Sequence, residues 1–177
     1  MMAEKMFMEN YKKTNFPTII CRFSNFYGPG QPLYRLIPKL CIALDLNIKF
    51  PMQGMGSSKR NFIYAKDFSA GILSVIKRGK TGKTYHFSGN QILSIKDVIR
   101  KICHIKNKRF DNYVISTKDR KNKDSIYYLQ SKMTRKELKW EPKTSLLLGL
   151  KETVKFYKKN LGYFMKKKIK INFKFKK

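Results

Sequence analysis

The stretch CRFSNFYGPG, residues 21–30, places polar side chains at the end of an apolar run and then breaks on a Gly-Pro-Gly turn. The Asn25 amide can both donate and accept hydrogen bonds, and Arg22 carries a fixed positive charge. In open α/β sheets ligands bind at the carboxyl ends of the strands, and glycine lets the backbone approach a ligand closely. These residue types suit a ligand site at a strand end, and a turn with incidental polar residues explains the stretch equally well.

Two further groups of charged residues could bind an anion. Arg60 stands between a glycine-rich turn and an apolar strand, and Asp119 and Arg120 are adjacent in the polar segment DRKNKD. Arginine offers planar, charge-assisted donors that suit phosphate. The structural alternatives are a surface arginine at position 60 and a local turn pair at 119–120. No Ser/His/Asp or Cys/His arrangement is visible, and Asp67 is expected to cap a helix rather than to act as a general base.

The cysteines and the hydropathy exclude several classes of protein. Cys21, Cys41 and Cys103 are odd in number and widely spaced, without a CxxC or Cys/His ligand pattern. We therefore expect free thiols in a reducing compartment and no metal site. No apolar run approaches the roughly 18 residues of a membrane span, and the first residues do not resemble a signal peptide. The sequence thus predicts a cytoplasmic protein without a membrane segment.

The net charge of the chain favours anionic partners. Forty Lys and Arg against eleven Asp and Glu give a formal charge of +29, which suits nucleic acid, acidic lipid or phosphorylated small molecules. A second explanation is compositional, because Lys, Asn, Ile and Phe are abundant together, as in proteins from AT-rich genomes. The charge is also spread along the chain, without the clustered stripe typical of a nucleic-acid surface.

The periodicity of the apolar residues predicts strands that alternate with helices, and hence one α/β domain. Ser94 is expected to cap a helix with Asp97 in a capping-box pattern, and Trp140 to anchor a core between two helices. Neither a GxGxxG turn nor a phosphate-binding P-loop is present. Helices are expected over 2–14, 33–46, 67–77, 95–105, 131–138 and about 145–160, and strands over 18–23, 48–51, 61–64, 84–87 and 113–117.

Five motifs in order resemble one enzyme family. They are CRFSNFYGPG, FPMQGMGSSKRNFIYAKDFSAGI, GKTYHFSG, DRKNKD and SKMTRKELKWEPKTSLLLGLKETVKFY. Together they are similar to the carboxyl-terminal part of nucleotide-sugar epimerases and dehydratases of the extended short-chain dehydrogenase/reductase family, with dTDP-glucose 4,6-dehydratases as the closest match. The resemblance covers about residues 1–160. Each motif alone is a weak signal, and the shared order makes the combination specific.

The resemblance implies a two-lobed enzyme in which a Rossmann lobe binds NAD(P) and a smaller lobe binds a nucleotide diphosphate sugar. Met1–Glu4 matches the stretch just after the family's catalytic Tyr-x-x-x-Lys pair. We therefore expect the N-terminal cofactor-binding half to be absent. Residues 1–162 are expected to form a partial Rossmann-type sheet, with its last strands and helices, and a small α/β substrate-binding lobe. The basic tail 163–177 is expected to be disordered.

The resemblance also implies roles for individual residues. The implied substrate-binding residues are Asn25, Arg35, Leu36, Pro51, Met52, Gln53, Arg60, His86, Asp119 and Arg120. Asn25 and Arg60 match phosphate contacts, and His86 either contacts the substrate or is an ordinary strand residue. Arg22 and Tyr27 lie on the cofactor side, where Tyr27 either packs in the core or contacts the nicotinamide part of the pocket.

Three positions at or beside the implied substrate-binding residues depart from the family pattern. Lys121 and Asn122 replace a Pro-Gly pair after Arg120, and Gln53 stands where an aromatic residue is common.

In function, the resemblance implies an NAD-dependent dehydratase or epimerase that transiently oxidises C4 of the sugar. We expect this chain alone to bind a dTDP- or UDP-sugar, not to bind NAD and not to turn over. Because the strand over 18–23 would leave an open sheet edge, we expect the chain to form an oligomer or to bind a separate chain that carries the Rossmann half. The alternatives are a basic nucleic-acid-binding module and a relic fragment without function.

Overall fold

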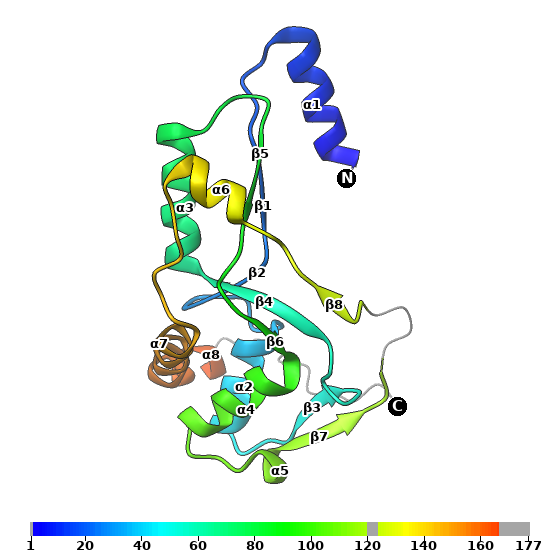
Figure 1. The fold of residues 1–177 in the computed structure, drawn as a ribbon. Coiled ribbons are helices and arrows are strands. Elements are labelled where there is room, and N and C mark those ends of the chain that lie inside the picture. The colour runs from blue at the N-terminus through cyan, green and yellow to red at the C-terminus, as the bar shows by residue number, and fades with distance from the viewer. Residues whose placement is uncertain (1, 120–123, 167–177) are drawn as a thin grey trace.

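The computed structural model describes residues 2–119 and 124–166, which form a mixed α/β fold with parallel strand pairs, as the sequence predicts (Figure 1). The helices are α1 (Met2–Thr14), α2 (Leu36–Asp45), α3 (Ala65–Arg78), α4 (Ile95–Ile105), α5 (Phe110–Tyr113), α6 (Lys132–Leu138), α7 (Leu146–Lys159) and α8 (Leu161–Lys166). The strands are β1 (Ile20–Phe23), β2 (Asn25–Tyr27), β3 (Phe50–Gln53), β4 (Lys59–Tyr64), β5 (Thr84–Phe87), β6 (Ile92–Ser94), β7 (Val114–Thr117) and β8 (Ile126–Tyr127).

The described strands form three small sheets. β1 pairs with β5, β2 with β4 and β3 with β7, each in parallel. β4 also pairs with β6 in antiparallel and with β8 in parallel. Among the described strands β1 has one partner only, so its other edge is open. This arrangement agrees with a partial Rossmann-type sheet joined to a smaller α/β lobe.

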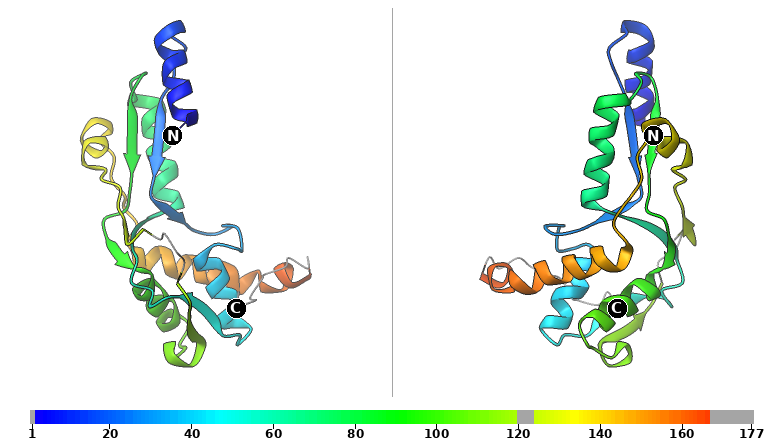
Figure 2. Two further views of the ribbon diagram at one scale, coloured as in Figure 1. Left: turned by 90° about the vertical axis from the view of Figure 1, so that its right-hand side faces the viewer. Right: turned by 60° about the vertical axis from the view of Figure 1, so that its left-hand side comes forward.

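The fold has two separate hydrophobic cores. The helices around the larger core, α2, α4 and α7, lie together at one end of the molecule (Figure 2). The larger core lies where α2, α4 and α7 pack on one another, and Leu40, Ile99 and Leu150 in it are completely buried. The smaller core lies between α3, α6 and β5, around Phe87 and Trp140. Burying these side chains removes apolar surface from water, which stabilises each part.

The α4 helix begins as the sequence predicts. The Ser94 hydroxyl accepts a hydrogen bond from the Asp97 backbone N–H at 3.0 Å, and the Asp97 carboxylate accepts one from the Ser94 backbone N–H at 3.3 Å. This reciprocal pair is a capping box, and it satisfies donors that the first helical turn leaves unpaired. The buried residues Val98, Ile99 and Ile102 then share one face of the helix.

Trp140 is a core anchor, as predicted, but Asp67 is not the cap of α3. The helix begins at Ala65 with Tyr64 in the N-cap position. The buried Asp67 carboxylate instead accepts hydrogen bonds from the backbone N–H groups of Lys143 and Thr144, both at 3.0 Å. Its backbone carbonyl accepts from the Trp140 indole at 3.1 Å. Asp67 therefore fastens the segment that leads from α6 to α7.

Several elements differ from the sequence prediction. The elements β2, β6, β8 and α5 were not predicted. Residues 163–166, expected to begin a disordered tail, belong to α8, where Phe164 packs against the larger core. The rest of the tail, 167–177, lies outside the described residues. Cys21, Cys41 and Cys103 are free thiols, as predicted.

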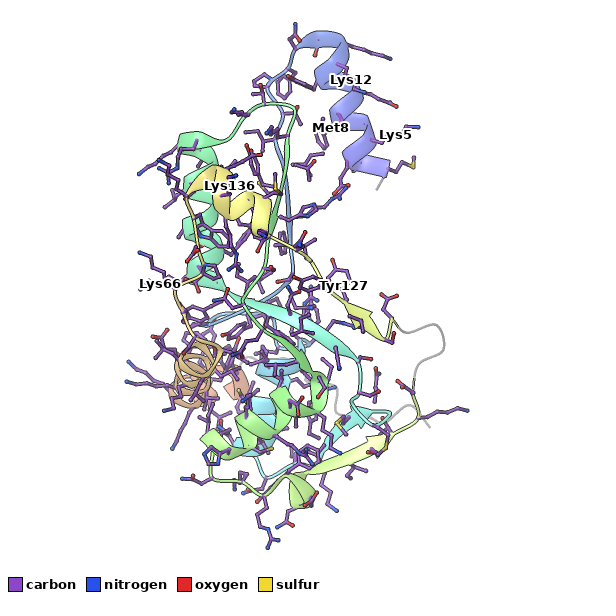
Figure 3. The ribbon with its side chains drawn as sticks, in the orientation of Figure 1. Lys5, Met8, Lys12, Lys66, Tyr127 and Lys136 are labelled. Atoms are coloured by element: carbon purple, nitrogen blue, oxygen red, sulfur yellow. The ribbon has the colours of Figure 1, made fainter. Side chains whose placement is uncertain are left out.

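The α1 helix stands away from the rest of the fold, and none of its residues is buried (Figures 1 and 3). The Arg22 guanidinium joins it to β1 by two hydrogen bonds to the Glu4 carboxylate, at 2.6 and 2.9 Å. The apolar side chains of Met2, Met6 and Phe7 are 52–90% exposed. Of the helices in the described ranges, none is both long enough and apolar enough to cross a membrane.

Candidate functional site

The opening motif lies where the chain changes its sheet partner. Phe23 ends β1 opposite Phe87 of β5, and the Ser24 backbone N–H donates to the Phe87 carbonyl at 2.9 Å. From Asn25 onward the chain pairs with β4 instead. Because β5 and β4 diverge here, space opens at the carboxyl end of β1, the position at which α/β sheets bind ligands. The chain then turns through Gly30, whose φ of +79° is a conformation that favours glycine.

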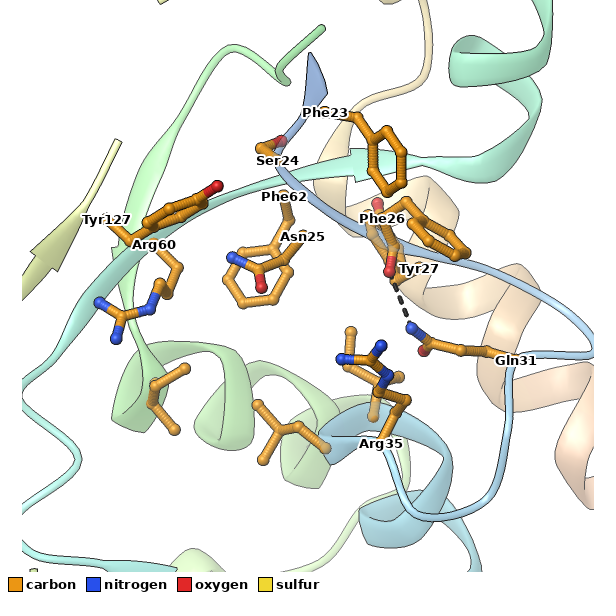
Figure 4. Close-up of a pocket in the computed structure, with 13 residues that line it drawn as sticks. Phe23, Ser24, Asn25, Phe26, Tyr27, Gln31, Arg35, Arg60, Phe62 and Tyr127 are labelled. Atoms are coloured by element: carbon orange, nitrogen blue, oxygen red, sulfur yellow. Dashed lines mark hydrogen bonds between the residues drawn. The ribbon is translucent and has the colours of Figure 1, made fainter. Parts of the chain in front are cut away.

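A pocket of about 330 Å³ occupies this space (Figure 4). Its walls come from β1, β2, the turn that follows β2, the first turn of α2, β4, the start of α4 and β8. The lining residues are Phe23, Ser24, Asn25, Phe26, Tyr27, Gln31, Arg35, Leu36, Ile37, Arg60, Phe62, Ile95 and Tyr127. Two arginines and no carboxylate occur in this set, so the pocket carries positive charge.

Asn25 projects from β2 into this space. Its amide nitrogen lies 3.4 Å from the backbone carbonyl of Asn61 on β4, to which it donates a long hydrogen bond. In the strand register Asn25 faces Phe62, and the Phe62 ring forms the adjacent wall. Asn25 therefore keeps an amide that can donate and accept toward a ligand.

Arg60 lines the pocket and also holds a neighbouring segment in place. Its Nη1 donates to the backbone carbonyl of Lys59 at 2.8 Å, and its Nη2 donates to the backbone carbonyl of Asp124 at 2.9 Å. A guanidinium has five N–H donors, so these two bonds leave others for a ligand. Tyr127, three residues beyond Asp124, lies beside Arg60 at the same end of the pocket (Figure 4).

Arg35 stands at the opposite end, directly before α2. It is the N-cap residue of that helix, and Leu36 and Ile37 bring the first helical turn to the pocket. The backbone N–H groups of a first turn and the helix dipole both favour an anion. The Arg35 guanidinium lies 5.3 Å from the centroid of the Tyr34 ring. The two arginines therefore border the pocket from opposite ends (Figure 4).

The other residues that the sequence predicts for the substrate do not line this pocket. Met52 is only 3% exposed and belongs to the larger core, while Pro51 and Gln53 flank it on β3. His86 is half-buried on β5, where its backbone N–H donates to the Thr134 hydroxyl. Asp119 is exposed beside Gly54, at the end of the β3–β7 pair. Arg120 lies outside the described residues.

The two residues predicted for the cofactor side are engaged within the chain. The Arg22 guanidinium binds Glu4, and this hydrogen bond lowers the pKa of the Glu4 carboxyl. Tyr27 is 1% exposed, its hydroxyl donates to the Leu146 carbonyl at 3.3 Å, and burial raises its pKa. Both side chains therefore already have partners within the protein.

Sequence reasoning missed most of the apolar wall and three lining residues with polar groups, Ser24, Gln31 and Tyr127. Phe23 and Phe26 pack edge to face with ring centroids 5.3 Å apart. Their clustering in one short motif was a usable signal. Gln31 and Tyr127 carry no comparable signal. Tyr127 reaches the pocket through the long-range pairing of β8 with β4, and the Gln31 amide is oriented by its bond to the Phe26 carbonyl.

Comparisons with known proteins agree with this architecture. The family model described as "GDP-mannose 4,6 dehydratase" matches residues 1–153. The human dTDP-D-glucose 4,6-dehydratase is 32% identical over 164 residues, which cover 89% of this chain and 47% of that protein. The chain thus spans about half the length of the curated relatives it matches.

Solved structures show the same fold. The dTDP-glucose 4,6-dehydratase of Bacillus anthracis, in complex with NAD, superposes with a TM-score of 0.86 at 29% identity, over 91% of this chain and 51% of that one. DesIV, the dTDP-glucose 4,6-dehydratase of Streptomyces venezuelae with NAD and TYD bound, has a TM-score of 0.87 at 27% identity, over 91% and 50%. The chain therefore belongs to the GDP-mannose 4,6-dehydratase family and corresponds to the carboxyl-terminal part of an extended short-chain dehydrogenase/reductase.

Proposed function

We propose that the pocket binds the diphosphate of a nucleotide sugar, with a dTDP- or UDP-sugar as the ligand. The observation that carries this proposal is that Asn25, Arg35 and Arg60, from three separate elements, border one pocket of about 330 Å³ that has no carboxylate in its lining. Two linked phosphoryl groups need charge-assisted donors on more than one side, and arginine supplies them.

Each of the three residues has a distinct role in the proposal. Arg60 and Arg35 donate to phosphoryl oxygens from opposite ends, helped by the first turn of α2. Asn25 donates its amide N–H groups between them. The relatives' names support this ligand class, because the human and Bacillus anthracis proteins are both named as dTDP-glucose 4,6-dehydratases.

We assign the nucleoside to the side of β3, where Pro51, Met52, Gln53 and Asp119 lie, with Arg120 as a further contact. His86, on β5, is kept as a separate substrate contact. The support for this assignment is proximity, because Gly54 follows β3, its backbone N–H donates to the Thr117 carbonyl at 2.7 Å, and Asp119 packs against it. β8, which bears Tyr127, pairs with β4 next to Lys59 and so continues the same side toward the pocket.

We further propose that the 177-residue chain performs no turnover alone. In the full-length family NAD supplies the hydride chemistry, and the catalytic Tyr-Lys pair precedes the segment that Met1–Glu4 matches. Arg22 and Tyr27, the residues with an expected cofactor contact, are engaged with Glu4 and Leu146. Within this proposal the chain binds and orients the sugar nucleotide, and a Rossmann half provides the cofactor.

Calorimetric titration of the purified chain tests both statements. We expect dTDP-glucose or UDP-glucose to bind, glucose not to bind, and incubation with dTDP-glucose and NAD to give no keto-sugar product. Binding of glucose as tight as that of the sugar nucleotides would contradict the diphosphate site, and keto-sugar formed by the lone chain would contradict the absence of turnover.

A partner for the open edge of β1 is also part of the proposal, either a second copy or a chain with a Rossmann half. The support is the single pairing of β1 and the exposure of Phe23, at 41%, with the apolar residues of α1. Sedimentation should show association of the lone chain. A sharp monomer that binds no hydrophobic dye would contradict it.

The charge of +29 supports nucleic-acid binding as a second candidate function. Affinity for a random single-stranded DNA would then fall steeply with salt, and sugar nucleotides would not compete. A third possibility is a relic without function. A chain that folds cooperatively and binds its ligand would exclude it.

We propose a cytoplasmic location because the three cysteines are free thiols, and cell fractionation tests it.

A further inference from the structure

Several buried polar atoms of the described residues lack a hydrogen-bond partner, and two of them belong to residues of the pocket. In residues 2–119 and 124–166, five buried side-chain polar atoms have no hydrogen-bond partner within the protein: Ser24 Oγ, Gln31 Oε1, Asp45 Oδ2, Ser58 Oγ and Asn61 Oδ1. Two of them, on Ser24 and Gln31, belong to residues that line the pocket. A buried group that lacks a partner destabilises the folded state, so its presence in a native structure requires an explanation.

The backbone of Ser24 holds its side chain at the pocket. Ser24 is the residue at which the chain leaves β5 for β4, and its backbone N–H is bonded to the Phe87 carbonyl. The residue is 2% exposed. A serine hydroxyl can donate once and accept twice, and it reorients by simple rotation about one bond. It can therefore pair with a ligand group of either polarity that enters the pocket beside it.

The Gln31 amide has a defined orientation. Its Nε2 donates to the Phe26 backbone carbonyl at 2.8 Å, and a carbonyl can only accept, so the nitrogen must be on that side. The remaining oxygen, Oε1, is then an acceptor without a donor, at the Arg35 end of the pocket (Figure 4). Phosphoryl oxygens are acceptors too, so they cannot satisfy it. A hydroxyl group can.

We propose that Ser24 Oγ and Gln31 Oε1 recognise hydroxyl groups on the glycosyl part of the bound sugar nucleotide, and so select for the sugar. This inference rests on the proposed function. The glycosyl part is favoured over the ribose because Gln31 lies across the pocket from Tyr127 and β8, the side to which we assign the nucleoside (Figure 4).

The first test compares the stability of a variant with its affinity for the ligand, because the inference predicts that the two change in opposite directions. Ser24→Ala removes an unpaired buried hydroxyl, so the thermal midpoint of the free chain should stay the same or rise. Affinity for dTDP-glucose should nevertheless fall by roughly two- to tenfold, the worth of one hydrogen bond, while affinity for dTDP stays unchanged. Ser58→Ala is the matched control, because Ser58 is 4% exposed and has an unpaired hydroxyl, but does not line the pocket. It should affect the midpoint similarly and leave both affinities unchanged.

The second test uses the ratio of two affinities. Gln31→Leu also removes the bond to Phe26, so a loss of stability alone would not be informative. The inference instead requires that the ratio of dTDP-glucose affinity to dTDP affinity fall by a similar factor. Gln91→Leu, the same change at an exposed glutamine outside the pocket, should leave that ratio unchanged.

The outcomes separate this inference from the proposed function. The inference would be overturned if Ser24→Ala and Gln31→Leu bound dTDP-glucose as tightly as their control variants. A trapped water would then explain the unpaired atoms. An equal loss for dTDP and dTDP-glucose would also overturn it, because the contact would lie on the nucleotide. A wild-type chain that binds neither dTDP-glucose nor UDP-glucose would refute the proposed function itself, and the inference with it.

Discussion

Arg60 and Asp124 are joined by a hydrogen bond of 2.9 Å from the guanidinium Nη2 to the backbone carbonyl. The bond ties β4 to the segment that begins β8, and so places Tyr127 at the pocket. One arginine thus forms part of the pocket wall and holds another part in place. Its substitution should affect the ligand in two ways, by loss of a donor and by release of β8.

Arg60→Lys should weaken binding of dTDP-glucose by about tenfold or more, because a single ammonium cannot reproduce both the carbonyl bond and a charge-assisted bond to phosphate. Arg109→Lys makes the same change at an exposed arginine outside the pocket and should have no effect. Calorimetric titration of both variants measures the difference. Equal affinities would exclude Arg60 from the site.

Asp67→Asn should lower the free energy of unfolding by about 1.5–3 kcal/mol, because an uncharged amide has one acceptor oxygen for two backbone N–H groups. Urea denaturation measures this loss, and Asp111→Asn, at an exposed position, is the control. Affinity for dTDP-glucose should remain that of the wild type. A large loss of affinity with unchanged stability would favour a ligand-directed role for Asp67.

The protein should lose stability at alkaline pH through Tyr64. The pKa of Tyr64 is raised to about 12, mainly by burial and secondly by the hydrogen bond to Glu152. Because the folded state holds this proton more tightly than the unfolded chain, the stabilisation is complete below pH ~10 and is lost as the pH rises through about 12. The effect is at most about 3 kcal/mol. Tyr64→Phe should flatten the dependence measured by urea denaturation, whereas Tyr34→Phe, at a 74% exposed tyrosine, should not.

Lys106→Met should destabilise the part of the fold around the larger core. The Lys106 ammonium lies 2.7 Å from Asp45 Oδ1, with side-chain exposures of 5% and 13%. Removing the cation leaves a largely buried carboxylate unpaired, which typically costs about 3–5 kcal/mol. Lys101→Met, at an exposed position of α4, should change the free energy of unfolding by less than about 0.5 kcal/mol. Similar stabilities for the two variants would show that the pair contributes little.

Local sequence signals predicted the elements whose determinants lie within one turn of the chain. The capping box of Ser94 and Asp97 defined the start of α4, and the Ser145 hydroxyl caps α7 by accepting from the Leu148 backbone N–H. β2, β6 and β8 were missed because each has only two or three residues and depends on pairing with β4. Asp67 was misassigned because its partners lie more than seventy positions away.

The same distinction applies to the candidate site. Family resemblance identified Asn25, Arg35, Leu36 and Arg60, which the fold brings to one pocket. Gln31 could not be identified from sequence, because its importance comes from a single backbone bond that orients its amide. Phosphate-binding residue types are recognisable in a sequence, whereas an unpaired buried atom is visible only in three dimensions.

The most direct test of the account is the affinity of dTDP-glucose for the wild-type chain and for the double variant Arg35→Ala/Arg60→Ala, at moderate salt. We expect measurable binding by the wild type and a loss of at least a hundredfold in the variant, because two charge-assisted contacts to the diphosphate disappear. Circular dichroism must show that the variant is folded. Equal binding by the two proteins would contradict a diphosphate site between these arginines.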